Sequence, residues 1–280
     1  MNKQKETKRY ISAVLGILLL CLVIFFIDTI LLNIVLSIIG ILAVYEAVIS
    51  SCKRVCYIYL ILCSIFVVLG LFIQIDLTLE IVLLLFLMFT TTMFSKKEHH
   101  FKDMSAVFLL TILISFGLSS LVKLRNLSSN IADMRVIVLF GLGYGWLGDS
   151  MAYTFGKAFG KKKLCPKISP NKTILGAVCG VTITTIVSVI LFFIYSTYCS
   201  NESIFYGKNT LGNLMVMVVV GLVGSVIGVV GDLALSYVKR EAGVKDFSNI
   251  MPGHGGALDR MDNIFFTSAY TYFIFSLLLK

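Results

Sequence analysis

The residues most capable of chemistry lie in one short polar segment, residues 236–262, which reads SYVKREAGVKDFSNIMPGHGGALDRMD. It combines five basic residues or histidines, four carboxylates and four glycines, although the sequence around it is almost continuously apolar. Carboxylates are preferred ligands of hard divalent cations, lysine and arginine bind phosphate, and glycine lets a backbone approach either group closely. The segment therefore indicates phosphoryl chemistry at a membrane surface.

A second polar segment, residues 156–174, carries six lysines and two of the three prolines of the chain. Pro166 and Pro170 favour an ordered turn over a continuous helix. The lysines, together with Ser169, Asn171 and Thr173, would suit a triphosphate or a lipid phosphate. Lysines also gather in cytoplasmic loops that bind no ligand, so this segment alone leaves both readings open.

The rest of the chain has the composition of a polytopic membrane protein. Of its 280 residues 58% are hydrophobic and 14% are charged, and the mean hydropathy is +0.94. These values exclude an ordinary soluble domain. The sequence predicts an all-α protein with about nine transmembrane helices, because apolar runs of spanning length fall near residues 10–27, 29–50, 57–75, 79–95, 104–122, 135–156, 175–198, 211–238 and 264–280.

We expect two regions in this membrane domain. Residues 1–135 hold about five spans, and residues 136–280 form the catalytic region, with its polar loops at 156–174 and 239–263. A cytoplasmic N-terminus and an outside C-terminus put 19 of the 24 lysines and arginines on the cytoplasmic side, together with both loops. The short loops and the lack of a targeting segment favour a plasma membrane of bacterial type. The seven cysteines show no metal-binding spacing.

Carboxylates inside the predicted spans are candidates for function, because burying an ionisable group in lipid is costly. Asp149 lies near the cytoplasmic end of the sixth span and Asp232 lies in the eighth. Asp232 continues a helical stripe of small residues, which Gly221, Gly224, Gly228 and Gly231 form. An ordinary packing helix with an interfacial aspartate is the alternative. Glu46, near the end of the second span, could be a third buried carboxylate, but we expect a position at the membrane interface.

The acidic residues of the first segment suggest a metal site. Asp259 and Asp262 are three residues apart and would share one face of a helix. With Asp232 they form a plausible site for magnesium, which prefers a few carboxylates plus substrate phosphates. His254 stands between glycines and is a candidate for proton transfer or hydrogen bonding.

At these residues the chain resembles the phosphatidate cytidylyltransferases, also called CDP-diacylglycerol synthases. The resemblance rests on Ser236, Lys239, Arg240, Lys245, Asp246, the run 252–256, Asp259, Arg260 and Asp262. It extends to Gly231-Asp232-Leu233, to Asp149, Ala152, Tyr153 and Gly156, and to Ser169-Pro170-Asn171-Lys172-Thr173. The strong match covers roughly residues 146 to 263. One departure is Leu175, which stands where the family usually carries glutamate.

The resemblance implies that CTP and phosphatidate react to CDP-diacylglycerol and diphosphate, as in phospholipid biosynthesis. The residues expected to act in catalysis are Asp232, Lys239, Arg240, Asp246, His254, Asp259 and Arg260. Those expected to bind substrate are Asp149, Tyr153, Lys167, Ser169, Asn171, Lys172, Thr173, Ser236, Lys245, Gly255 and Gly256. We expect Asp232, Asp259 and Asp262 to hold Mg²⁺, as one ion or two.

The expected partners are CTP, phosphatidate and membrane lipids, with no nucleic acid; the glycine stripe would permit a homodimer. Three alternatives stay open. The first is a related CTP-dependent lipid enzyme, such as a polyprenol kinase or an ether-lipid cytidylyltransferase. The second is a diverged paralogue without activity. The third is an ion-coupled transporter, against which the charged residues gather on one face instead of lining a path through the midplane.

Overall fold

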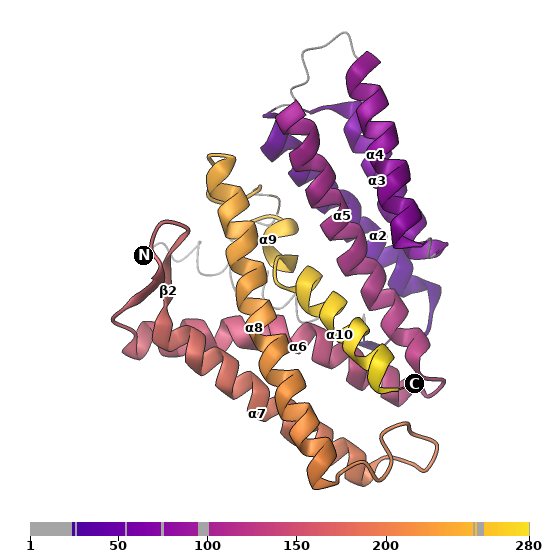
Figure 1. Ribbon diagram of the computed structural model, residues 1–280, viewed down its shortest axis with the longest axis vertical. Helices are drawn as coiled ribbons and strands as arrows, with labels where there is room; N and C mark the ends of the chain where they lie inside the picture. The colour runs from indigo at the N-terminus through magenta and orange to yellow at the C-terminus, as the bar shows by residue number, and fades with distance from the viewer. Residues whose placement is uncertain are drawn as a thin grey trace. The chain divides into compact units, whose positions relative to one another are not determined.

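The structure is a computed structural model, and it describes residues 24–25, 27–53, 55–73, 76–94, 101–248, 250 and 255–279 (Figure 1). The chain forms two compact units. The first comprises Met1–Val122 and Lys239–Met261, and the second comprises Lys123–Val238 and Asp262–Lys280. Each unit therefore combines two separate stretches of sequence, and the polar segment 236–262 contributes to both.

The first unit is built from long apolar helices. They are α2 (Ile30–Cys52), α3 (Tyr57–Phe72), α4 (Leu77–Phe94) and α5 (Phe101–Leu124), with the single turn α9 (Leu258–Met261). Helices α2 and α3 pack closely at Gly40, where a Cβ atom would lie 2.6 Å from a methyl carbon of Val67. Helix α2 also contacts α9, so it lies beside the end of the polar segment.

The second unit contains four long or medium helices and one hairpin. The elements are η1 (Arg125–Leu127), α6 (Ile131–Phe159), β1 (Lys163–Cys165), β2 (Ser169–Thr173), α7 (Ile174–Tyr198), α8 (Leu211–Glu241) and α10 (Ile264–Leu278). The antiparallel pair β1–β2 lies between α6 and α7 in the chain and pairs Lys163 with Thr173. The segment with the two prolines is thus an ordered turn and not a continuous helix, as expected. This hairpin is the exception to the predicted all-α fold in the part of the chain that the structure covers.

The glycine stripe of α8 is a packing surface, as predicted. A Cβ atom at Gly224 would lie 2.7 Å from the ring of Tyr144, and one at Gly231 would lie 2.7 Å from the ring of Phe266. At Gly228 it would lie 2.9 Å from the carbonyl oxygen of Tyr144. Small residues let helices approach closely in lipid. The stripe therefore holds α8 against α6 and α10.

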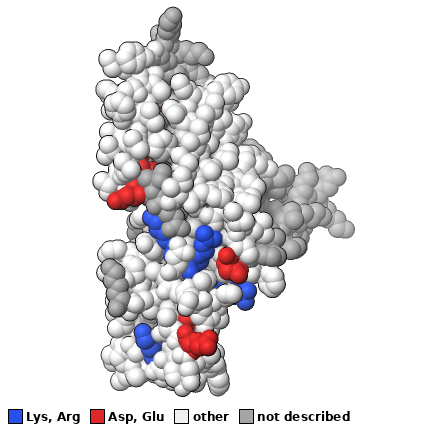
Figure 2. Space-filling model, turned by 90° about the vertical axis from the view of Figure 1, so that its right-hand side faces the viewer, with Lys and Arg blue, Asp and Glu red and all other residues white. Residues whose placement is uncertain are grey.

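In the part of the chain that the structure describes, six helices are long and apolar enough to cross a membrane. They are α2, α4, α5 continued through η1, α6, α7 and α8. Helices α3 and α10 coincide with two further predicted spans but have only 16 and 15 residues. The predicted span 10–27 lies almost entirely outside the described residues. On the face shown in Figure 2 most of the described surface carries no charge, as expected for a surface in contact with lipid. The number nine, the orientation and the division at residue 135 stay predictions.

A buried carboxylate that the sequence analysis did not single out lies at the start of α6. Asp133 has no exposed surface. It accepts hydrogen bonds from Ser128 Oγ (3.0 Å), Tyr195 OH (2.8 Å), Ser203 Oγ (2.5 Å) and the backbone N–H of Ile204 (2.9 Å). Four donors satisfy the carboxylate, as burial of a charge requires. Asp133 thus ties the start of α6 to the end of α7 and to the segment that follows it.

Candidate functional site

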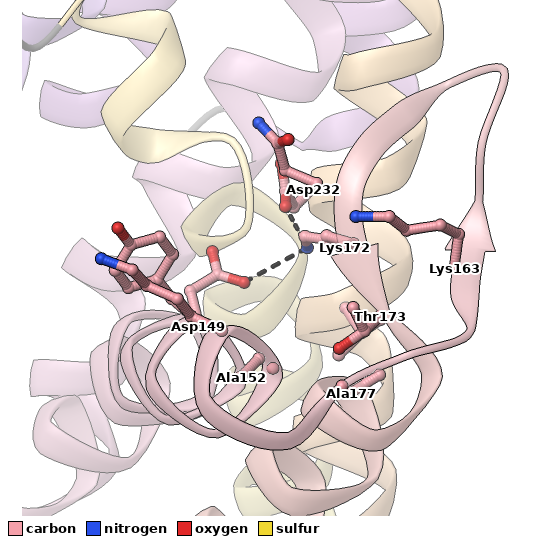
Figure 3. A pocket seen from close by; sticks show the side chains of 13 residues that line it. Asp149, Ala152, Lys163, Lys172, Thr173, Ala177 and Asp232 are labelled. Atoms are coloured by element: carbon pink, nitrogen blue, oxygen red, sulfur yellow. Dashed lines mark hydrogen bonds and ion pairs between the residues drawn. The ribbon is translucent and has the colours of Figure 1, made fainter.

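A pocket of about 630 Å³ opens in the second unit (Figure 3). Pockets for small molecules commonly have such volumes. Helices α6, α7 and α8 and the hairpin supply its walls, which consist of Asp149, Ala152, Tyr153, Gly156, Lys157, Gly160, Lys163, Asn171, Lys172, Thr173, Ala177, Val229 and Asp232. Three lysines and two aspartates in one hollow make it a candidate site for an anionic ligand.

The charged centre of the pocket is Lys172, whose side chain points between two carboxylates (Figure 3). Its Nζ atom lies 3.3 Å from Asp149 Oδ1 and also forms an ion pair with Asp232. Asn263 Nδ2 donates to the second oxygen of Asp149 (2.7 Å), and Ser236 Oγ donates to Asp232 (3.3 Å). Lysine and both aspartates are thus held in one network at the meeting of α6, β2 and α8.

The environment keeps Lys172 charged. Burial alone would lower the pKa of its ammonium group, but the carboxylates of Asp149 and Asp232 outweigh burial, so the pKa is raised above the ordinary value of 10.5. The pocket therefore holds a fixed positive charge at every physiological pH.

Thr173 positions Lys172, because it is both the last residue of β2 and the N-cap of α7. Its Oγ1 accepts a hydrogen bond from the backbone N–H of Gly176 (3.1 Å). A Cβ atom at Gly156 would lie 2.7 Å from the same Oγ1, so α6 approaches the cap closely. Thr173 lines the pocket, and the hydrogen bond that its hydroxyl accepts from Gly176 also fixes the hairpin to α7.

Leu175 lies in the first turn of α7, and its side chain is 41% exposed. It is not among the residues that line the pocket. The leucine found in place of the family's glutamate therefore removes no pocket-lining charge in this structure.

The position of Leu175 leads to a prediction. A Leu175→Glu variant should keep its turnover within about twofold, because position 175 does not line the pocket. A carboxylate in a first helical turn stabilises the helix by about 0.3–1 kcal/mol. Steady-state kinetics and thermal unfolding in detergent check both parts. A tenfold gain in turnover would mean instead that the family's glutamate acts in the reaction.

The pocket brings together several residues predicted to bind substrate. Asp149, Tyr153, Asn171, Lys172 and Thr173 all line it, beside Asp232, which was predicted to act in catalysis and to bind metal. Lys167 and Ser169 lie on the hairpin outside the lining, Lys167 being exposed. The predicted list omitted Lys157 and Lys163, although both belong to the lysine-rich loop. It also omitted Asn263. In the sequence, the position of Asn263 directly after Asp262, at the end of the polar segment, could have marked it as a candidate.

Asp259 anchors the polar segment in the first unit. Its Oδ1 accepts a hydrogen bond from Lys239 Nζ at 2.9 Å. Its Oδ2 accepts from the backbone N–H groups of Phe247 and Gly256, each at 2.9 Å. The Lys239 ammonium also lies 5.6 Å from the ring centroid of Phe247. These contacts close the segment into a loop around a buried ion pair.

The remaining predicted residues occupy various places. Arg240, Lys245, Asp246 and Arg260 are exposed, Asp262 is buried and follows the last residue of α9, and His254 lies outside the described residues.

The expectation for Glu46 was wrong: it has no exposed surface and is hydrogen-bonded inside the first unit. The interfacial reading failed because a single sequence does not show that backbone donors from the distant polar segment meet this carboxylate.

Carboxylates predicted to bind metal lie in both units, Asp232 in the second and Asp259 in the first. Asp232 already binds the ammonium of Lys172, which makes it a carboxylate positioned for positive charge. The two oxygens of Asp259 together accept three hydrogen bonds from protein donors. A carboxylate has about four lone-pair sites in all, so room is left for one further contact. Among the residues the structure describes, no three histidines, cysteines or carboxylates gather in a group that could hold a metal ion.

Comparison with known proteins decides the family. A model of the cytidylyltransferase family matches residues 7–278, nearly the whole chain. The chain belongs to the cytidylyltransferase family. The phosphatidate cytidylyltransferase of Staphylococcus haemolyticus is 34% identical to it over 181 residues, and that of Haemophilus influenzae is 41% identical over 136 residues. The uncharacterized protein YnbB of Escherichia coli is 37% identical over 172 residues.

These similarities cover only part of each protein. The matched segments comprise 65%, 48% and 61% of this chain, and 62%, 43% and 53% of the three relatives in the same order. The chain thus matches between about two fifths and three fifths of the length of these relatives. Membership of the family agrees with the resemblance in the polar segments.

Proposed function

We propose that this cytidylyltransferase transfers CMP from CTP to phosphatidate and releases diphosphate. The observation that carries the proposal is the pocket in which Lys172 lies between Asp149 and Asp232, with Lys157 and Lys163 on its walls. Two of the relatives described above are named phosphatidate cytidylyltransferase. A nucleoside triphosphate is an anionic ligand that would suit both the family and the lysines of this pocket.

The reaction needs charge neutralisation more than proton transfer. A phosphate oxygen of phosphatidate attacks the α-phosphorus of CTP, and the bond from that phosphorus to the bridging oxygen breaks. Diphosphate leaves with the electron pair. The attacking phosphate monoester is already ionised near neutral pH, so no general base is required. Because both reactants are anions, the protein must hold them together against their repulsion.

We assign that task to two groups of cations. Lys157, Lys163 and Lys172 would bind the phosphates of CTP in the pocket of the second unit. Lys239, Arg240 and Arg260 of the first unit would neutralise phosphate as well, the arginines by bidentate contacts. Asn171 and Tyr153 supply hydrogen-bonding groups to the pocket wall for the rest of the nucleotide.

Magnesium is the metal that we propose for the site. In the second unit Asp232 and Asp262 are the proposed ligands, with Asp149 beside Asp232 in the same network, and in the first unit Asp259 is a further proposed ligand. When bound, Mg²⁺ supplies positive charge to the phosphates of CTP and to the departing diphosphate. The protein's own part is to orient these carboxylates, which the bonds to Asp259 from Lys239, Phe247 and Gly256 do in the first unit.

Acceptor choice tests the proposal. Purified protein in detergent with Mg²⁺ and CTP would be offered phosphatidate, diacylglycerol or a polyprenol, and the lipid products would be separated by chromatography. We expect CDP-diacylglycerol from phosphatidate and no product from the two lipids without phosphate. Equal or faster conversion of the polyprenol would replace phosphatidate as the substrate and move the protein to another CTP-dependent lipid reaction.

A further inference from the structure

Glu46 links the N-terminal part of the chain to the polar segment. The residue lies on α2, more than 200 positions before its partners, and both belong to the first unit. Its carboxylate accepts hydrogen bonds from Ser248 Oγ (2.5 Å) and from the backbone N–H groups of Ala257 (2.9 Å) and Leu258 (2.8 Å). A fully buried carboxylate with three protein donors is an organised contact and not a solvated end of a helix.

Gly256 fits against this carboxylate. A Cβ atom at position 256 would lie 2.5 Å from Cδ of Glu46, closer than real Cβ atoms come to other atoms. The second glycine of the Gly255-Gly256 pair is therefore required by the approach of Glu46. From the sequence alone, Gly256 is predicted only to bind substrate.

The contacts of Glu46 and Asp259 are interleaved along the backbone. Asp259 accepts from the N–H of Gly256, and Glu46 accepts from the next two N–H groups, those of Ala257 and Leu258. On the other side of residues 249–254, Asp259 accepts from Phe247 N–H and Glu46 from Ser248 Oγ. The two carboxylates thus hold both ends of the stretch that contains Pro252-Gly253-His254.

We propose that Glu46 is a positioning residue for the transfer reaction. It fixes the backbone of Ala257 and Leu258 and thereby the orientation of the adjacent Asp259 carboxylate and its ion pair with Lys239. Glu46 touches neither CTP nor phosphatidate in this account; it acts through Asp259. The inference rests on the proposed function, because Asp259 and Lys239 belong to the proposed machinery.

The first test is a Glu46→Gln variant, which keeps the shape but replaces one acceptor oxygen by a donor NH₂ group. At least one of the three donors then loses its acceptor. Exchange of the Ala257 and Leu258 amide hydrogens should become about tenfold faster or more, since a hydrogen bond to a charged group is lost. The value of kcat should fall about tenfold or more, whereas KM for CTP should stay within about twofold.

Glu80→Gln is the matched control. Glu80 is likewise a buried carboxylate on a span of the first unit, and it accepts a hydrogen bond from Ser115, away from the polar segment. We expect it to leave exchange at Ala257 and Leu258 unchanged and to lower kcat less than Glu46→Gln does. Unchanged exchange in Glu46→Gln, or equal losses of kcat in the two variants at equal thermal stability, would overturn the inference.

A double substitution keeps the inference testable if Glu46→Gln folds poorly. Gly256→Ala alone should lower kcat about tenfold or more, because the new methyl group meets the Glu46 carboxylate. Glu46→Asp retracts the carboxylate by about 1.5 Å, one C–C bond, and makes room for that methyl group. In the Glu46→Asp background the loss from Gly256→Ala should therefore be smaller. Losses that simply multiply would contradict a direct contact.

The inference and the proposed function fail separately. Hydrogen exchange at Ala257 and Leu258 reports the contacts of Glu46 without any turnover. Wild-type protein that transfers no CMP to phosphatidate would end the proposed function, whereas normal exchange in Glu46→Gln would end the inference even in an active enzyme.

Discussion

Replacing Lys172 by methionine is expected to lower kcat/KM for CTP about a hundredfold or more. The substitution keeps the length of the side chain and removes the ammonium that lies between Asp149 and Asp232. The two carboxylates would then present uncompensated negative charge to the phosphates of CTP. Removing one preorganised charge-stabilising group from an active site commonly costs a factor of about 10² to 10³. Initial rates over a range of CTP concentrations give the value.

The control for this experiment is Lys162→Met. Lys162 lies on the same lysine-rich loop, but it is exposed and does not line the pocket. Its replacement should leave kcat/KM within about twofold. If Lys172→Met and Lys162→Met behave alike, the lysines of this loop act only through their general positive charge, and the pocket is not the CTP site.

The raised pKa of Lys172 has a consequence for pH dependence. A cation whose pKa is raised by folding stabilises the folded protein. This stabilisation is fully present below the ordinary lysine pKa of 10.5 and is lost as the pH rises through the pKa that Lys172 has in the folded protein. Between about pH 6 and 9 the charge of Lys172 should therefore not change. Thermal unfolding should show an alkaline loss of stability in wild-type protein that is smaller in Lys172→Met. A titration of this lysine near neutral pH would contradict the ion-pair network.

Asp259→Asn should abolish turnover, by a factor of about 10³ or more. The amide can offer its oxygen either to Lys239 or to the backbone N–H groups of Phe247 and Gly256, but not to both. Breaking one partner of a buried ion pair commonly costs about 3–5 kcal/mol, so we also expect a lower melting temperature. The sequence alone predicts a folded but inactive variant; the contacts of Asp259 add the cost in stability.

Activity and stability can be separated for this variant. Turnover would be measured well below the melting temperature, and CTP binding would be measured beside it. Glu241→Gln, which alters an exposed carboxylate at the end of α8, is the comparison and should retain its activity. Near-normal turnover of Asp259→Asn would exclude both the proposed metal contact and the need for the Lys239 ion pair.

Hydrophobic runs predicted most of the helices well. Eight of the predicted spans coincide with helices of the structure, each within four residues at either end. The reason is physical: a run that must cross hydrocarbon has to satisfy its backbone hydrogen bonds internally, so length and hydropathy determine the helix. The glycine stripe of α8 was equally predictable, because close packing in lipid requires small residues at helical spacing.

The contacts between distant segments could not be predicted in the same way. The spacing of Asp149, Lys172 and Asp232 in the sequence contains no sign that they form one network, since it depends on how α6, β2 and α8 pack. Glu46 was misjudged for the same reason, because its three donors lie far along the chain. Residue types indicated the chemistry of the polar segments, but only tertiary packing determines which carboxylate meets which donor.

The central claim is that the group transferred is CMP, and the position of a label in CTP tests it most directly. Two reactions with phosphatidate and Mg²⁺ would run in parallel, one with CTP labelled in the α-phosphate and one with CTP labelled in the γ-phosphate. The account predicts α-label in the lipid product and γ-label in free diphosphate. Transfer of the γ-label to lipid would identify a kinase and contradict the account, and so would the absence of both labels from lipid while the protein is folded and binds CTP.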